Sequence, residues 1–235
     1  MNGVSAALLG TILAIGLALG GYFAGNGFVQ ARALERFVEV KGLAEREVRA
    51  DTAIWPLQFV VVGNELDTLL AEAEQQGEQV RAFLTLHGFA ADEISANAPS
   101  INDRLVHGYA DPNLKYRYSV SQVITVFTSK IDEVRAAGRE LLELGKAGIV
   151  FNQDHYEFRP QYLFNGLNDL KPGMIEDATG NARDVAQKFA EDSASRLGKI
   201  RSARQGQFTI SDRDSNNPHI KNVRVVSTLE YYLAD

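Results

Sequence analysis

The chain contains no cysteine among its 235 residues. Disulfide bonds, thiolate nucleophiles and cysteine-ligated zinc sites are therefore excluded, although a chain without cysteine suits a cytosolic and a periplasmic protein equally. The chain also lacks a dense run of Lys and Arg, and its formal net charge is −6 at pH 7. Because phosphate contacts supply most of the affinity for nucleic acid, we expect no nucleic-acid partner.

Catalytic motifs are also missing. There is no GxSxG nucleophile elbow and no phosphate-binding P-loop, and the four histidines, His87, His107, His155 and His219, show no metal-ligand spacing. Asp212, Asp214 and Asn216 occupy the first, third and fifth positions of a calcium-loop pattern, but the required glycine and glutamate are absent. A solvated turn is therefore favoured there. We predict no catalytic, metal-binding or cofactor-binding residue and no cofactor.

Charge is absent from the whole stretch between Asn2 and Ala31, and residues 4–23 form an apolar run. A helix of about 20 apolar residues crosses the roughly 30 Å hydrocarbon core of a bilayer. The sequence therefore predicts an N-terminal transmembrane helix that contacts membrane lipid through residues 4–23. Tyr22 and Phe23 are aromatic residues of the kind favoured at the membrane interface.

A cleaved signal peptide is the alternative explanation of this run, with small-x-small sites at residues 18–20 and 31–33. Signal peptides begin with a basic region, and residues 1–3 contain no Lys or Arg, which favours an uncleaved anchor. The charges after the run, Arg32 and Arg36, point to a cytoplasmic domain, but two arginines are a weak signal of orientation. Either explanation brings the rest of the chain to a membrane or across it.

The rest of the chain has an ordinary globular composition, since the whole sequence is 45% hydrophobic and 23% charged. Strand patterns and helix patterns are mixed along it, which favours an α+β fold with mixed or antiparallel sheets packed with three amphipathic helices. The expected strands cover 36–48, 52–62, 94–105, 115–128, 149–159, 207–211 and 223–233, and the expected helices cover 66–86, 131–144 and 175–197.

Particular residues refine these expectations. The gap at residues 49–51 suits a hairpin turn between the first two strands, and Pro56 indicates a strand edge or bulge. Gly88 is expected to end the first helix and Gly198 the last. Trp55 is expected in the core. The expected inward side of the last helix consists of Ile175, Ala178, Ala182, Val185, Phe189 and Leu197.

Residues 38–53, VEVKGLAEREVRADTA, resemble the opening of the SIMPL domain family, also called DUF541. Gly42 and Asp51 match the family pattern, whereas Ala44 and Ala50 stand where the family often has glycine and proline. Further likeness follows in YRYS and the VITV after it at residues 116–126, in residues 131–134 and 145–149, and in the alanine-rich helix at 181–198.

The resemblance covers nearly everything after Arg36 and implies an α+β fold, an exported or membrane-anchored location in bacteria, and oligomerisation. It carries no agreed catalytic residues. We therefore expect residues 1–33 to be the anchor and joint, and residues 34–235 to be one SIMPL-like domain. The expected location is the bacterial inner membrane, crossed once, with the domain in the periplasm.

The function expected from these features is a non-enzymatic envelope module for interaction, assembly or stress response. It is expected to form a homo-oligomer and to bind protein partners. Glycines spaced four residues apart, at 16 and 20 and at 21 and 25, could pair two anchors. Tyr109, in the loop 105–113, is a second candidate contact. The alternative is an enzyme or small-ligand-binding protein with an unrecognised site.

Overall fold

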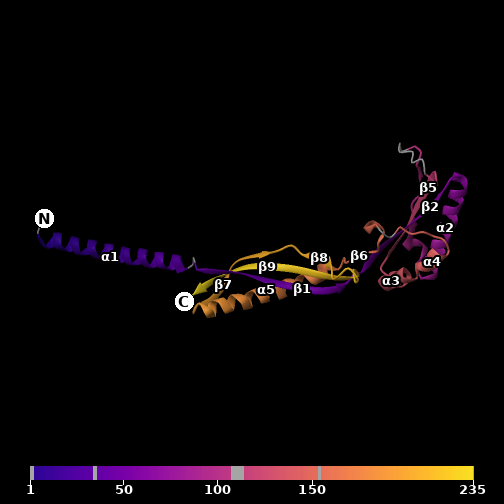
Figure 1. The fold of residues 1–235 in the computed structure, drawn as a ribbon. Coiled ribbons are helices and arrows are strands. Elements are labelled where there is room, and N and C mark those ends of the chain that lie inside the picture. The colour runs from indigo at the N-terminus through magenta and orange to yellow at the C-terminus, as the bar shows by residue number, and fades with distance from the viewer. Residues whose placement is uncertain (1–2, 34–35, 107–113, 153–154, 235) are drawn as a thin grey trace. The chain divides into compact units, whose positions relative to one another are not determined.

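The computed structural model describes residues 3–33, 36–106, 114–152 and 155–234 (Figure 1). The chain divides into two compact units. The first unit contains residues 1–46, 170–209 and 223–235, and the second contains residues 47–169 and 210–222. Each unit has its own sheet and its own covering helices, so each is described by itself.

Helix α1 (Gly3–Ala33) is 31 residues long and includes the apolar run expected to be helical. The large apolar side chains described in α1, from Ile12 to Phe23, are more than half exposed, with Leu17 at 70% and Phe23 at 69%. Space is open around Gly16 and Gly20, where an added Cβ would meet no atom within 4 Å. Within the described residues, no helix has both the length and the apolar character that crossing a membrane requires.

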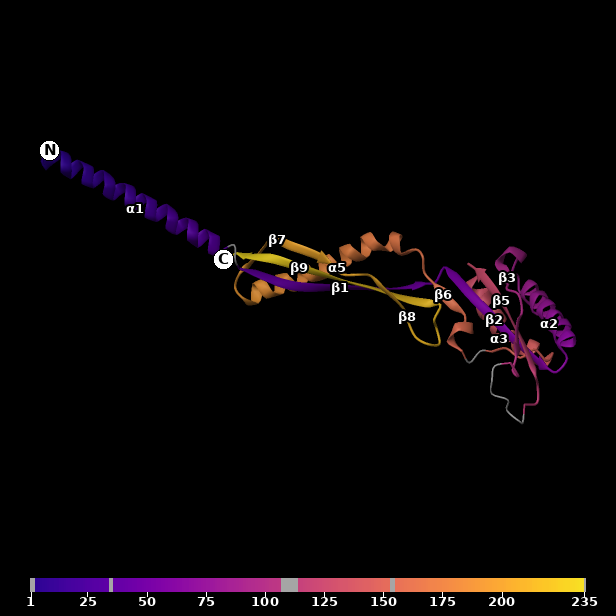
Figure 2. The same cartoon turned by 90° about the horizontal axis from the view of Figure 1, so that it is seen from above.

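The first unit is a sheet covered by helix α5 (Leu167–Asp192). Strand β9 (Ile220–Ala234) lies between β1 (Phe37–Arg49) and β7 (Arg196–Gln205), and β8 (Thr209–Asp212) also pairs with β9 (Figure 2). The helix presents a stripe of small or unbranched side chains spaced four residues apart, namely Met174, Ala178, Ala182, Ala186 and Ala190. This spacing places them on one helix face.

The end of α5 differs from the sequence expectation. The helix covers 167–192 rather than 175–197, and the chain reverses at Ala194, which has a φ of 53°. Gly198 does not end the helix but lies in β7, where an added Cβ would approach the carbonyl oxygen of Tyr232 to 2.8 Å. Position 198 therefore requires glycine because the backbone of β9 packs closely against it, and not because a helix ends there.

The inward face of α5 was also predicted only in part. Ala178 and Ala182 are fully buried as expected, but Val185 and Phe189 are 41% and 54% exposed. The face turned to the sheet is the stripe of Met174 and the four alanines, which we call the alanine stripe. Small side chains are needed there because the backbone of β1 comes very close to the helix at Gly42. Large side chains would not fit between them.

The second unit is a five-stranded sheet with helices on one face. Strand β2 (Thr52–Gly63) pairs antiparallel with β5 (Tyr118–Thr128) in an unbroken register from Ala53↔Thr128 to Gly63↔Tyr118. The strand order is β3-β5-β2-β6, with β4 also on β5. The other elements are α2 (Leu66–Leu86), β3 (Ile94–Ala96), β4 (Ser100–Asp103), α3 (Ile131–Glu140), α4 (Leu142–Lys146) and β6 (Gln161–Leu163).

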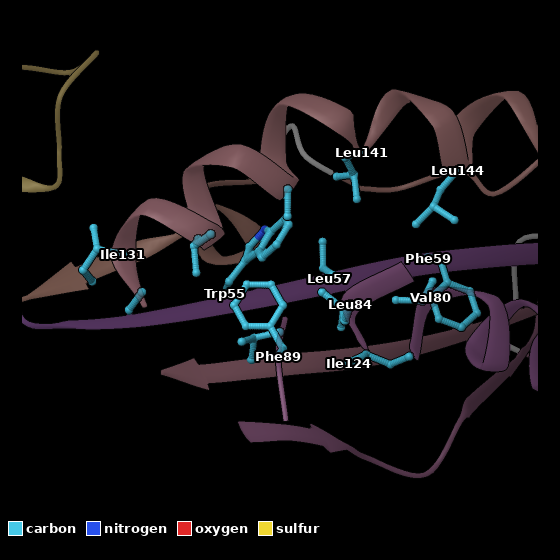
Figure 3. Close-up of a cluster of buried hydrophobic side chains, with 14 of the residues drawn as sticks. Trp55, Leu57, Phe59, Val80, Leu84, Phe89, Ile124, Ile131, Leu141 and Leu144 are labelled. Atoms are coloured by element: carbon cyan, nitrogen blue, oxygen red, sulfur yellow. The ribbon is translucent and has the colours of Figure 1, made fainter. Parts of the chain in front are cut away.

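The core of the second unit lies between this sheet and the three helices (Figure 3). Trp55 is 2% exposed and meets Phe89 edge to face, with ring centroids 6.5 Å apart. The expected core role of Trp55 is confirmed. The fully buried members of the cluster include Phe59, Val80, Leu84, Phe89, Ile124, Val126, Val134 and Ile149.

Two strand predictions for this part of the chain are wrong. Residues 49–51 do not form a hairpin, because β1 and β2 belong to different sheets. The amide of Asp51 instead donates to the carbonyl of Leu163. The described residues of the segment 149–159, namely 149–152 and 155–159, do not form the expected strand either. Only Phe151 makes a bridge, to Phe59, and a 3-10 turn (Tyr156–Phe158) follows it. The polar stretch after Phe151 lacks the alternation that a paired strand needs.

Other expectations hold with changed bounds. The helix at 66–86 is confirmed, and Gly88 follows it with a φ of 87°. The helix expected at 131–144 is divided at Leu141 into α3 and α4, and the extended segment at 94–105 forms the two short strands β3 and β4. Pro56 lies where β2 pairs with β5 alone, since β6 pairs only with Thr52–Ile54. This is the strand edge that the proline predicted.

Candidate functional site

A cavity of about 780 Å³ lies within the second unit. This volume is typical of sites for small molecules. Three segments distant in sequence form its wall: helix α3, the stretch from Tyr156 to Leu163, and the loop between β8 and β9. The lining side chains used below are Val134, Arg135, Arg139, Tyr156, Arg159, Pro160, Tyr162, Leu163, Asp212, Pro218, His219 and Lys221.

Helix α3 contributes two arginines to this wall. The helix buries Ile131, Val134 and Ala137 against the core. Arg135 and Arg139, spaced four residues apart, therefore lie together one turn apart beside that buried face. Arg135 Nη1 lies 3.4 Å from Asp132 Oδ1, and this pair is solvent-exposed. Both arginines of the helix therefore line the cavity.

The stretch after the 3-10 turn contributes a third arginine and two tyrosines. The amide of Arg159 donates to the carbonyl of Tyr156, at an N···O distance of 3.2 Å. Tyr156 is 76% exposed, whereas Tyr162 is only 7% exposed because it pairs with Ala53 on the core side of the sheet. The turn therefore places one exposed and one buried aromatic ring at the cavity.

The loop between β8 and β9 closes the wall. Asp214 Oδ1 accepts hydrogen bonds from the amides of Asn216 and Asn217 at 3.0 and 2.9 Å, which holds the loop in a turn. Lys221 Nζ donates to the carboxylate of Asp212. His219 is 5% exposed, and its ring lies 6.0 Å from that of Tyr162 at an angle of 67°.

The cavity wall is electrically positive. Among the described residues that line it, Arg135, Arg139, Arg159 and Lys221 stand against one carboxylate, Asp212, which is already paired with Lys221. Burial lowers the pKa of His219 below its ordinary value. The positive charges of Arg135, Arg49 and Arg213 lower it further, while Asp132 acts in the opposite direction. His219 is therefore neutral at pH 7, and its neighbours repel an added positive charge.

A second feature of this unit is the face of the sheet turned away from its core. Because Phe127 of β5 stands opposite Ile54 of β2, and Val123 opposite Gln58, these side chains point to the same side. Phe127 is 60% exposed. We call this surface the open face, and it consists of Thr52, Ile54, Pro56, Gln58, Val60, Val62, Ser119, Ser121, Val123, Thr125 and Phe127. None of these residues is charged.

Comparison with protein families agrees with this architecture. The family model for SIMPL, described as a protein of unknown function (DUF541), matches residues 38–226. The chain belongs to the SIMPL family. No curated protein matches the chain significantly. The likeness noted at residues 38–53 is thus confirmed, and the match includes parts of both units of this SIMPL chain.

The SIMPL-pattern residues Gly42 and Asp51 both have a structural role. Gly42 lies under α5. The Asp51 carboxylate accepts hydrogen bonds from the amides of Asn165 and Gly166, at 2.7 and 3.1 Å, and from the Thr52 hydroxyl at 2.9 Å. Burial by itself would raise the pKa of Asp51, but these donors outweigh it and the pKa is lowered. The carboxylate therefore joins β2 to the segment after β6.

Of the side chains singled out from the sequence, Asp212, Asn216 and His219 lie together at the wall of the cavity. Tyr109 and His107 lie outside the described residues. Tyr118 packs beside the core of its unit, and Arg117 lies over its ring at 4.7 Å. Asp212 is paired with Lys221, and the described part of the chain holds no group of three or more potential metal ligands.

The cavity arginines escaped the sequence analysis because they come from two separate segments, α3 and the stretch after the 3-10 turn. His219 was considered only for metal ligation, and Arg135 and Arg159 were not singled out at all. One local signal was available: Arg135 and Arg139 are four residues apart and so share one side of the expected helix.

Proposed function

We propose that this SIMPL protein is a non-catalytic module that self-associates in the bacterial envelope, held at the membrane by α1. The open face is the observation that carries the proposal. A surface of two long paired strands without charge is unusual for a sheet that faces water, where polar and charged side chains normally alternate with buried ones.

The occupant that we assign to the open face is a second copy of the chain. Two sheets pack face to face about 10 Å apart through side chains of this size. The open face contains apolar side chains such as Ile54, Val60 and Phe127 beside small hydroxyl residues. Because it has no charge, it needs no partner of opposite charge, and two identical faces can meet about a twofold axis.

A charge at the centre of the open face tests self-association. Val123 stands opposite Gln58 in the middle of the β2–β5 pair. In sedimentation of the full chain in detergent, Val123→Glu should raise the dissociation constant of the oligomer about tenfold or more, because two carboxylates would be buried in the contact. Gln75→Glu, at an exposed position on α2, is the matched control. Equal association of Val123→Glu and the natural chain would refute the proposal.

The membrane attachment rests on α1. The sequence from Asn2 to Ala31 has no charge, and the described apolar side chains of α1, such as Leu13 and Leu17, are largely exposed. Transfer of exposed apolar surface of this kind from water into lipid is favourable and lowers the free energy. We propose insertion in the inner membrane with the remaining chain in the periplasm.

Membrane fractionation tests this attachment, and protease protection of a tag at the C-terminus tests its sidedness. The tag should be protected in intact cells with a sealed outer membrane and digested after that membrane is permeabilised. Leu17→Arg should move the protein toward the soluble fraction, because a charge at the centre of a membrane helix costs about 2.5–3.5 kcal/mol. Full-length natural chain that remains in the soluble fraction contradicts the attachment.

A further inference from the structure

We infer that the cavity of the second unit binds a small organic oxyanion, with a carboxylate or phosphate group held by Arg135, Arg139 and Arg159. This goes beyond self-association, because it assigns a ligand class to a separate site. The site is built within one unit, from side chains that the fold brings together from three segments.

The described lining of the cavity has an excess of positive charge. Arg135, Arg139 and Arg159 belong to it, and its one described acid, Asp212, is paired with Lys221. Outside the lining, Asp132 pairs with Arg135 at 3.4 Å. Arg139 is exposed, and no described residue forms an ion pair with it. Guanidinium groups present several N–H donors in a plane, which matches the two or three oxygens of a carboxylate or phosphate. An anion in the cavity would also relieve the repulsion between Arg135 and Arg139.

Two nearly buried side chains that can form hydrogen bonds also line the cavity. His219 and Tyr162 are both nearly buried, with rings 6.0 Å apart. A neutral imidazole can donate one hydrogen bond and accept another, and a phenol can donate one. Hydrogen bonds from these two groups have preferred directions, so together with the three arginines they can orient a bound oxyanion. A surface with positive charge alone would attract the oxyanion without fixing its orientation.

Part of the cavity wall is apolar. Val134, Pro160, Leu163 and Pro218 line the same cavity, and the ring of Tyr156 is 76% exposed beside them. Sites for small molecules combine such apolar walls with a few convergent polar groups. A volume of about 780 Å³ exceeds what inorganic phosphate alone would fill. The ligand class is therefore an oxyanion that bears an apolar or aromatic body.

Calorimetric titration of the full chain in detergent tests this inference with phenyl phosphate and benzoate as probes. Phenol and benzyl alcohol are the neutral partners, and inorganic phosphate lacks the apolar body. We expect saturable binding of at least one aromatic anion, no saturable binding of the neutral partners, and weaker binding of inorganic phosphate. A short-chain phosphatidylglycerol, kept monomeric, distinguishes a lipid headgroup from a soluble ligand. The site is supported whether the phospholipid or the soluble aromatic anion binds more tightly, and the tighter of the two identifies the source.

Variants locate the binding. Arg139→Gln and Arg159→Gln should each weaken the affinity for the bound anion about tenfold, the loss expected for one charge-assisted hydrogen bond. Arg139→Lys should lose less because it keeps the charge. Arg81→Gln is the control, since Arg81 lies on α2 outside the cavity with its side chain 40% exposed, and it should bind as the natural chain does.

Three results would overturn the inference. They are no saturable binding of any anionic probe, equal binding of phenol and phenyl phosphate, and unchanged affinity in both Arg139→Gln and Arg159→Gln. Far-UV circular dichroism and the fluorescence of Trp55, which lies in the same unit, show whether each variant is folded. Sedimentation of the Val123→Glu variant measures self-association without any anion present. A failure of anion binding is therefore distinguishable from a failure of the proposed self-association.

Discussion

A methyl group added to Gly42 would overlap the carbonyl oxygen of Ala178 and would lie 2.8 Å from the Cβ of Ala182. Helix α5 therefore rests directly on the backbone of β1, with no side chain between them. The contact explains both the glycine in the strand and the alanine stripe on the helix.

Gly42→Ala should destabilise the first unit by about 3 kcal/mol or more, because backbone atoms, which cannot rotate away, occupy the space of the new methyl group. Chemical denaturation followed by circular dichroism measures the change. Gly180→Ala is the matched control, since Gly180 lies in α5 with open space around it. That change should stabilise the helix by about 0.5–1 kcal/mol, and a similar gain for Gly42→Ala would contradict the close contact.

Glu93 should make the second unit acid-sensitive. Burial favours the protonated carboxyl, but hydrogen bonds from Lys130, Thr128 and the amide of Ala90 outweigh it and lower the pKa of Glu93 from 4.5 to about 2. Because the folded-state pKa lies below the unfolded value, the carboxylate stabilises the fold above about pH 4.5. That stabilisation disappears as the pH falls from there toward 2.

The measurement is the free energy of unfolding, followed by Trp55 fluorescence in urea at about pH 6 and about pH 3. For the natural chain, Glu93 should account for a loss of about 2 kcal/mol over this range, after allowance for solvent screening. Glu93→Gln should remove that part of the pH dependence. Glu74→Gln, an exposed acid on α2, should retain it. An unchanged pH profile in Glu93→Gln would count against the network.

Asp51→Asn should destabilise the second unit by about 1–3 kcal/mol, because Oδ2 accepts from the amides of Asn165 and Gly166 while Oδ1 accepts from the Thr52 hydroxyl and the Asn165 side chain, and an amide group would turn its NH2 toward one of these two sets of donors. Denaturation monitored at Trp55 measures the loss. Asp92→Asn, an exposed aspartate of the same unit, should change stability by less than about 0.5 kcal/mol. Equal stability of the two variants would show that the turn does not depend on this carboxylate.

Phe89→Ala should cost about 3–5 kcal/mol, because the ring is 2% exposed and packs against Trp55. The fluorescence of Trp55, the single tryptophan of the chain, should also shift to longer wavelength as water reaches the vacated space. Phe127→Ala removes the same ring from a position that is 60% exposed. In dilute protein, where the chain is dissociated, that control should lose about 1 kcal/mol or less.

Local pattern was sufficient for some elements. The helix Leu66–Leu86 and the stop at Gly88 were predicted because apolar spacing and a glycine with positive φ act within one segment. Strands β2 and β5 were predicted for the same reason. Pairing was not predictable in this way. Strands β1 and β2 are adjacent in sequence but belong to different sheets, since each pairs with a partner far along the chain.

The last helix shows why a face can be misassigned. Val185 and Phe189 are larger and more apolar than the alanines, so apolar periodicity predicts them as inward residues. The structure buries Ala186 and Ala190 instead and leaves Val185 and Phe189 largely exposed. Distance decides this outcome: a helix that approaches a glycine of a strand must present its smallest side chains, whatever their hydrophobicity.

The sequence alone determined the α+β class, the apolar N-terminal helix, the core position of Trp55 and membership of the SIMPL family, because composition, period and short motifs are local properties. The tertiary structure alone decided the two-sheet division, the uncharged open face and the grouping of Arg135, Arg159 and His219 around one cavity. Those features depend on which distant segments meet, and a strand or helix pattern specifies its own buried side without specifying its neighbour.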